Sequence, residues 1–184
     1  IVALEMNRIN ISSLNAICPK GLVPTMPFLF DSIAHMRKSL DGPVGEEILK
    51  GCESQGLVGL AFYDSGARSI YAKKPVRNLA DVKGLKIRVP DAPAYLAFPK
   101  ALGANATPIA FAEVYLALQS GTVDAQENPL PTIEAKKFFE VQKNISLTGH
   151  IVDSLLTVVS GQLWGRLSAD EKKMFSEVME EAAE

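Results

Sequence analysis

Apolar and polar residues recur along the chain in a way that predicts short strands and helices in turn. Residues 57–63 form a nearly continuous apolar run, which is typical of a parallel strand buried on both faces. Residues 85–89 alternate between apolar and basic side chains, which indicates a strand that ends before Pro90. Further strands are expected at residues 70–72, 104–109 and 123–129 and before His150.

Between these strands, apolar residues recur at helical spacing and are bounded by capping and stop residues. Asp31 or Ser32 can cap a helix that runs to residue 40, and residues 168–171 form a capping-box pattern. Further helices are expected at residues 44–55, 78–82, 95–102 and 111–120 and from residue 132 onward. Residues 1–11 fit the end of a helix running into a strand, and residues 64–69 a hinge-like segment of small residues. Strands that alternate with helices predict an α/β architecture with parallel pairing.

The composition narrows the class of protein. With 184 residues, 47% of them apolar, the chain can bury a core. A formal charge of −2 with dispersed basic residues argues against a nucleic-acid partner, and no apolar run approaches the roughly 20 residues of a membrane span. The chain opens without Met and closes inside a helical pattern, so we expect an internal piece of a longer protein. Cys18 and Cys52 can pair or remain buried thiols.

Polar groups with binding chemistry follow several of the predicted strands. Arg88 is the expected anchor, because the crevice beyond the carboxyl ends of strands holds ligands in open α/β sheets and Arg matches a carboxylate with two donors. A shared pocket for an anionic ligand would bring together Arg68, Arg88 with Asp91, and Glu127 with Asn128. The alternative is that the arginines are solvated surface residues and that the acidic and amide groups form a loop.

His150 is either a further wall of this pocket or a structural histidine. No nucleophile or metal-ligand partner lies at a recognisable spacing from it. Gly-rich phosphate loops and clustered Cys and His ligands are also absent from the sequence. We therefore expect no catalytic residue, no metal and no cofactor.

Six segments, in the same order along the chain, resemble the solute-binding proteins of TRAP transporters. The similarity covers essentially the whole chain from Phe28 onward, and a series in register is far more specific than one motif. The segments are residues 66–68, 85–90, 111–119, 126–129, 137–143 and 147–150.

The resemblance implies a two-lobed, periplasmic-binding-protein-like α/β fold with mixed or parallel sheets, helices on both faces and a long bracing helix. Lobe I would comprise residues 1–65, incomplete, together with residues 154–184, which return to it and begin the long helix. Lobe II would comprise residues 66–153. Closure would be hinge-like, with residues 64–68 and the chain near Asp153 absorbing the change in the backbone.

It also implies a role and a set of binding residues. The chain would be part of a monomeric periplasmic receptor that captures an organic acid and passes it to a membrane permease, and would be no enzyme. Arg88 corresponds to the main carboxylate-binding arginine, Asn128 to its amide partner and Arg68 to a second arginine. The remaining expected pocket residues are Phe111, as an aromatic packing residue, Glu127 and His150, as in the sialic-acid-binding branch, and Asp91, where that branch has an amide.

For the solute we expect a hexuronate such as D-glucuronate or D-galacturonate. One carboxylate clamp together with Asp91 and Glu127 as hydroxyl acceptors suits a hydroxylated sugar acid. A C4-dicarboxylate or sialic acid is the alternative ligand for the same fold, and ligand sensing is the alternative role. A sugar-acid lyase or isomerase, with Glu127 or His150 as base, is the rival from another class.

Overall fold

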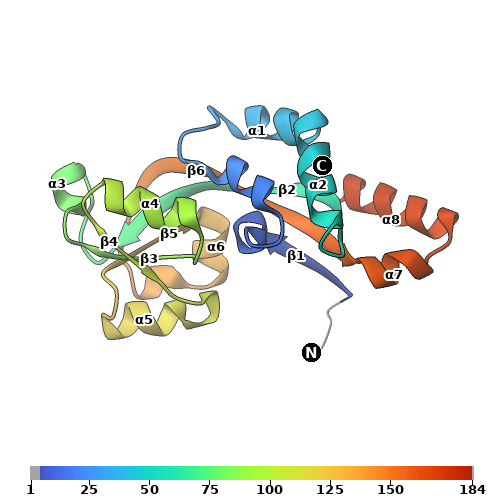
Figure 1. Ribbon diagram of the computed structural model, residues 1–184. Helices are drawn as coiled ribbons and strands as arrows, with labels where there is room; N and C mark the ends of the chain where they lie inside the picture. Colours follow the sequence, from blue (N-terminus) through green and yellow to red (C-terminus); the bar gives the residue numbers. More distant parts are fainter. Residues whose placement is uncertain (1–4, 184) are drawn as a thin grey trace. The chain divides into compact units, whose positions relative to one another are not determined.

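A computed structural model describes residues 5–183 (Figure 1). The chain divides into two compact units. Unit 1 comprises the residues up to Pro24, residues Phe30–Asp64 and the residues from Ser154 onward. Unit 2 comprises Thr25–Leu29 and Ser65–Asp153. That these units act as the two lobes of a receptor stays a prediction.

Unit 1 contains the short strand β1 (Met6–Asn10), which pairs antiparallel with the second half of β6 (Asn144–Ser160). The strand expected near residues 1–11 is thereby confirmed, whereas residues 1–4, where the end of a helix was expected, lie outside the described residues. The helices of this unit are η1 (Ile11–Leu14), η2 (Pro19–Thr25), α1 (Ile33–Leu40), α2 (Pro43–Glu53), α7 (Gly161–Arg166) and α8 (Ala169–Glu181).

The predicted helix starts of unit 1 follow from their caps. The Ser32 hydroxyl accepts a hydrogen bond from the backbone N–H of His35 at 3.0 Å, which starts α1. Ser168 and Glu171 cap each other at the start of α8, so the predicted capping box is confirmed.

Cys18 and Cys52 form a disulfide, which resolves the alternative that the sequence left open. Their Cα atoms lie 4.8 Å apart, and the bond ties the loop around η2 to α2. Both cysteines are buried. The bond therefore links two segments that are 34 residues apart in the sequence.

Unit 2 is built on a mixed sheet. Strand β3 (Lys86–Val89) pairs in parallel with β4 (Asn105–Pro108) and with β5 (Ala125–Pro129), while β2 (Leu57–Ala72) pairs antiparallel with β5. Along the hydrogen bonds the strand order is β1-β6-β2-β5-β3-β4. The helices of this unit are α3 (Leu79–Val82), α4 (Pro93–Ala101), η3 (Phe111–Glu113), α5 (Val114–Ser120), α6 (Leu130–Ala135) and η4 (Phe138–Glu140).

One prediction about strand β2 is confirmed and one is wrong. Residues 57–63 do form part of β2, whose residues 68–72 pair antiparallel with β5, and the parallel pairing expected for residues 57–63 stays a prediction. Residues 64–69 were expected to interrupt β2, yet the strand continues from Leu57 to Ala72. Gly66 adopts a φ of +91°, so the small residues change the local backbone without ending the strand.

Helices cover both faces of the unit 2 sheet, as expected. Figure 1 shows α4 and α5 on opposite sides of β3. One face packs Tyr95 of α4 against Ile87 and Val89 of β3. The other packs Val114 and Leu118 of α5 against Tyr71 and Phe138. Side chains of the strands therefore lie in one of two cores, according to the face on which they project.

Candidate ligand-binding site

All seven predicted binding residues belong to unit 2, and the structure buries five of them. The buried residues are Arg68, Arg88, Glu127, Asn128 and His150. Asp91, between β3 and α4, and Phe111, at the start of η3, are exposed. A buried polar side chain needs a hydrogen-bond or ion-pair partner. The partners of these five residues therefore show which of them are already paired within the protein and which could bind a ligand.

Strand alternation distributes these residues between the two faces of the sheet. Gln126 of β5 lies beside Arg88 of β3 and opposite Tyr71 of β2, so the three share a face. Asn128, two residues further along β5, projects on the same side. Glu127 projects on the opposite side, which is the side of Arg68.

Arg68 is the centre of a buried ion cluster. Its Nη1 donates to Asp153 Oδ2 at 2.6 Å and its Nη2 to Glu127 Oε1 at 2.8 Å, and its Nε donates to Glu127 Oε2. The guanidinium lies 4.8 Å from the ring centroid of Tyr95, whose hydroxyl donates to Asp153 Oδ1 at 3.1 Å. Arg68 is thus held by protein carboxylates, and its main effect is to fix Glu127 and Asp153.

Glu127 is charged in this cluster although it is buried. Burial alone would raise its pKa, but the positive charge of Arg68 and hydrogen bonds from His150 and Arg68 outweigh burial and lower the pKa of Glu127 below its ordinary 4.5. Burial by itself would lower the pKa of Arg68, but the negative charges of Glu127 and Asp153 raise it. The His150 Nε2 lies 3.3 Å from Glu127 Oε2, and its Nδ1 lies 2.7 Å from Thr148 Oγ1.

Arg88 differs from Arg68 in that none of the carboxylates of the described residues pairs with it. Its Nε donates to the Ile109 carbonyl at 2.8 Å, and within residues 5–183 no acidic side chain forms an ion pair with it. Only 3% of the residue is exposed. Burial lowers the pKa of Arg88 to about 10, so the group stays charged at neutral pH. A desolvated guanidinium with open donors is suited to accept an anion.

The amide of Asn128 links the two faces of the sheet. We assign its oxygen as the acceptor of a hydrogen bond from Arg68 Nη2 at 3.2 Å, because its nitrogen can then donate to the Tyr71 hydroxyl at 3.2 Å and to the Glu127 carbonyl at 3.3 Å. The side chain of Gln126 is fully buried beside it. Asn128 is therefore positioned by the same residues that hold the Arg68 cluster.

The sequence did not identify Asp153 and Tyr95 as partners of Arg68. Asp153 follows the apolar pair Ile151 and Val152 in β6 and is itself buried. A single carboxylate inside a buried strand requires a cation or strong donors, and that requirement was the available signal. It does not, however, indicate which arginine of the chain supplies the charge.

Other site types find no support in the described part of the chain. Residues 5–183 hold no group of three His, Cys, Asp or Glu side chains that could bind a metal. Over the same range, no helix combines the length and the apolarity that a membrane crossing demands.

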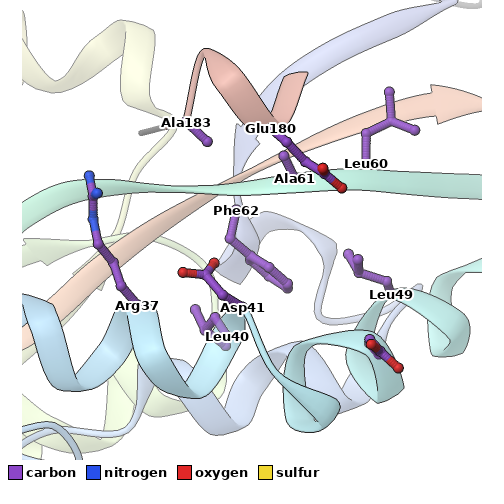
Figure 2. A pocket seen from close by; sticks show the side chains of 10 residues that line it. Arg37, Leu40, Asp41, Leu49, Leu60, Ala61, Phe62, Glu180 and Ala183 are labelled. Carbon is purple, nitrogen blue, oxygen red and sulfur yellow. The ribbon is translucent and has the colours of Figure 1, made fainter. Parts of the chain in front are cut away.

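A cavity of about 440 Å³ lies in unit 1, and none of the predicted binding residues lines it (Figure 2). Its lining combines apolar side chains with the acidic residues Asp41, Glu46 and Glu180. Arg37, the basic residue of its lining, is paired with Asp64. An organic anion would be repelled there, because like charges disfavour its approach. The lining comprises Arg37, Leu40, Asp41, Glu46, Leu49, Leu60, Ala61, Phe62, Glu180 and Ala183.

Comparison with known proteins identifies the family. The sequence profile of the bacterial extracellular solute-binding proteins, family 7, matches residues 3–184. The chain belongs to this solute-binding protein family. Membership confirms the predicted resemblance, and it confirms the prediction that the chain is a binding protein and not an enzyme.

Similar proteins of known name or structure belong to the same class of solute-binding proteins. The 2,3-diketo-L-gulonate-binding periplasmic protein YiaO of Escherichia coli K12 is 42% identical over 168 residues, which cover 88% of this chain and 51% of that protein. A TRAP periplasmic solute binding protein of Xanthobacter autotrophicus Py2, solved with β-D-galacturonate, is 46% identical with a TM-score of 0.92, covering 95% of this chain and 59% of that one. A third, from Pseudomonas putida F1 with D-glucuronate, is 38% identical with a TM-score of 0.95, covering 99% of this chain and 60% of that one.

These comparisons confirm the predicted fold class of the solute-binding protein, a mixed α/β sheet with helices on both faces. The chain spans about half to three fifths of the length of the proteins it matches. The expected long helix is represented within the described residues by α8, which covers Ala169–Glu181.

Proposed function

We propose that the chain is part of a periplasmic TRAP receptor that binds a hexuronate, with Arg88 holding the carboxylate of the sugar acid. The supporting observation is the state of Arg88, which is buried and charged and forms no ion pair within residues 5–183. Burying the charge of Arg88 costs free energy, and a bound anion would offset that cost. The same cost at Arg68 is already offset by Glu127 and Asp153.

Asn128 and Phe111 complete the proposed carboxylate site. Asn128 lies on the same face as Arg88, and the Arg88 guanidinium carbon lies 5.9 Å from the ring centroid of Phe111. Arg68 and His150 support this site indirectly. Their hydrogen bonds fix the side chain of Glu127, the residue that precedes Asn128 in β5. Asp91 is the proposed acceptor for hydroxyl groups.

A hexuronate is favoured over a C4-dicarboxylate by the charges present. A second buried carboxylate would need a second buried cation, but Arg68 is committed to two protein carboxylates. The galacturonate and glucuronate complexes of the similar proteins support the same choice. Delivery to a TRAP permease and a periplasmic location follow as proposals from the names of the related proteins.

Titration calorimetry on the intact protein tests this function. D-galacturonate, D-glucuronate, sialate and a C4-dicarboxylate are compared in wild type and in the Arg88→Ala and Arg88→Lys variants. A uronate should bind most tightly, and Arg88→Ala should weaken it about 30-fold or more, since removing one partner of a desolvated charge pair costs roughly 2–5 kcal/mol. Arg88→Lys should also bind poorly, because an ammonium lacks the planar pair of donors.

Arg77→Ala is the matched control, because it removes an exposed arginine outside the proposed site. Its affinity for the uronate should equal that of wild type. Unchanged affinity in both Arg88 variants would reject the carboxylate role of Arg88. Absence of uronate binding in wild type would reject the proposed ligand class.

A further inference from the structure

The exposed ring of Phe111 has two cations beside it. The guanidinium carbon of Arg88 lies 5.9 Å from the ring centroid, and the ammonium nitrogen of Lys136 lies 5.6 Å from it. The ring is 42% exposed and meets Phe138 edge-on at 6.1 Å, which fixes its orientation. Distances of this size allow cation–π attraction, so both cations interact with the same ring.

Lys136 is placed by the end of helix α6. It is the residue that ends this helix, and its backbone N–H donates to the Thr132 carbonyl at 3.1 Å. Its side chain is exposed, and no acidic group of residues 5–183 forms an ion pair with it. The ring of Phe111 is therefore the partner that directs this ammonium.

The two cations differ in burial, and the difference separates their effects on an anion. Arg88 is 3% exposed, so its contact with a carboxylate would be desolvated and would resist dissociation. Lys136 is exposed, so its field extends through water and attracts an anion before contact. Charges at the rim of a binding site change mainly the association rate and its dependence on salt.

We propose that Lys136 is the capture residue of the carboxylate site, a specificity residue that selects anionic sugars by speeding their association. The inference rests on the proposed function, because it assigns a second cation to the same site. Arg88 then sets how long the acid stays bound, and Lys136 sets how fast it arrives. A neutral sugar gains nothing from Lys136, so the residue discriminates the acid from its uncharged analogue.

Stopped-flow kinetics of D-galacturonate binding to the intact protein test this assignment. In Lys136→Gln at about 10 mM salt, the association rate should fall about 3- to 10-fold, with the dissociation rate within about twofold of wild type. The difference should vanish near 1 M salt, where the Debye length is about 3 Å instead of about 30 Å. Lys136→Arg keeps the cation and should retain the wild-type rate.

Lys137→Gln is the matched control, since it removes the same charge one residue further along and Lys137 forms no cation–π contact with Phe111 among the described residues. At low salt its association rate should fall less than that of Lys136→Gln, because the Lys137 ammonium is not held on the Phe111 ring, and near 1 M salt it should equal that of wild type. Equal losses in Lys136→Gln and Lys137→Gln would overturn the capture role while leaving the uronate site intact. Failure of wild type to bind any acid of the calorimetric series would overturn the proposed function and, with it, the role of Lys136.

Discussion

Arg68 places a single guanidinium against two buried carboxylates, Glu127 and Asp153. Each carboxylate is about 2–3% exposed, so neither can recover its hydration if the cation is lost. Removing one member of a buried ion cluster costs more than the cluster contributes, because the remaining charges stay buried without compensation. The stability of unit 2 therefore depends on the side chain of Arg68.

Replacing Arg68 with Met should lower the free energy of unfolding by about 3–5 kcal/mol at pH 7, because Glu127 and Asp153 lose their cation. Urea denaturation followed by circular dichroism measures the change. Arg77→Met, at an exposed position, should change the free energy by less than about 0.5 kcal/mol. A loss no larger than that of the control would show that the buried Glu127 and Asp153 do not depend on Arg68 for their stability.

The same substitution should change how stability depends on pH. In wild type the pKa of Glu127 is lowered below 4.5, so its charged form contributes stability above that pH, and the contribution is lost as the pH falls. Without Arg68, His150 and Arg88 still lower the pKa of Glu127, but burial has the larger effect, so we expect this pKa to rise. The variant then loses stability as the pH rises, so the gap in unfolding free energy should widen from pH 4 to pH 7, whereas a constant gap would contradict this coupling.

The sequence singles out Arg88 as the expected anchor but does not identify the partners of Arg68. The position of Arg88 depends on a local pattern, alternating residues that end at Pro90. Arg68 and Asp153 are 85 residues apart, and their contact depends on the pairing of strands, which no local pattern specifies. The sequence could therefore point to the arginine that we propose as the anion-binding residue, while its distinction from Arg68 required the fold.

At the scale of single elements, strand β2 shows how a turn-like composition can occur inside a strand. Residues 64–69 resemble a break because Gly66 and its small neighbours have low strand propensity. The ladder with β5 at residues 68–72 compensates, since its backbone hydrogen bonds do not depend on side-chain type. Propensity therefore predicted the location of a special backbone conformation but not the continuation of the strand.

Gly66→Ala should destabilise the protein by about 1–2 kcal/mol. The added Cβ would have ordinary contacts, 3.6 Å from the Pro129 Cβ, so the cost comes from the φ of +91° alone. Thermal unfolding measures the effect. Gly165→Ala in α7 is the control, since its Cβ would meet no atom within 4 Å, and there alanine should stabilise the helix by roughly 0.5–1 kcal/mol. Equal effects at both positions would contradict the assigned strain.

The disulfide of unit 1 should contribute roughly 3–4 kcal/mol to stability, the amount expected for a closed loop of 34 residues. The double variant Cys18→Ala and Cys52→Ala should lose this amount in urea denaturation. Reduction of wild type with dithiothreitol should produce the same loss, and the double variant should be insensitive to the reductant. Equal midpoints for oxidised and reduced wild type would contradict the contribution.

At the scale of the whole molecule, the chain passes between the two units at four points. Two of these, at Asp64 and Asp153, lie inside the long strands β2 and β6, and the other two bound the segment Thr25–Leu29. Strands that continue from one unit into the other leave no loop at residues 64–69 to absorb a hinge motion. Closure would therefore have to bend strands, and Gly66, which already adopts a φ of +91°, is a glycine of β2 at which the backbone can change.

We expect the intact protein to close when it binds a uronate. A ligand shifts a conformational equilibrium only by its difference in affinity for the two states. A carboxylate on Arg88 gains most when water is excluded, so the closed state should bind it more tightly. Small-angle scattering should show a smaller radius of gyration with saturating D-galacturonate than without it.

Arg88→Lys and Lys137→Gln separate closure from an effect of the added solute. Arg88→Lys lacks the paired donors, so its scattering curve should not change at the same sugar-acid concentration, while Lys137→Gln should close as wild type does. Gly66→Ala should bind more weakly than wild type, because the bend in β2 that closure requires becomes costlier. Identical curves for wild type with and without ligand, at concentrations where calorimetry shows saturation, would mean that the acid binds without any closure.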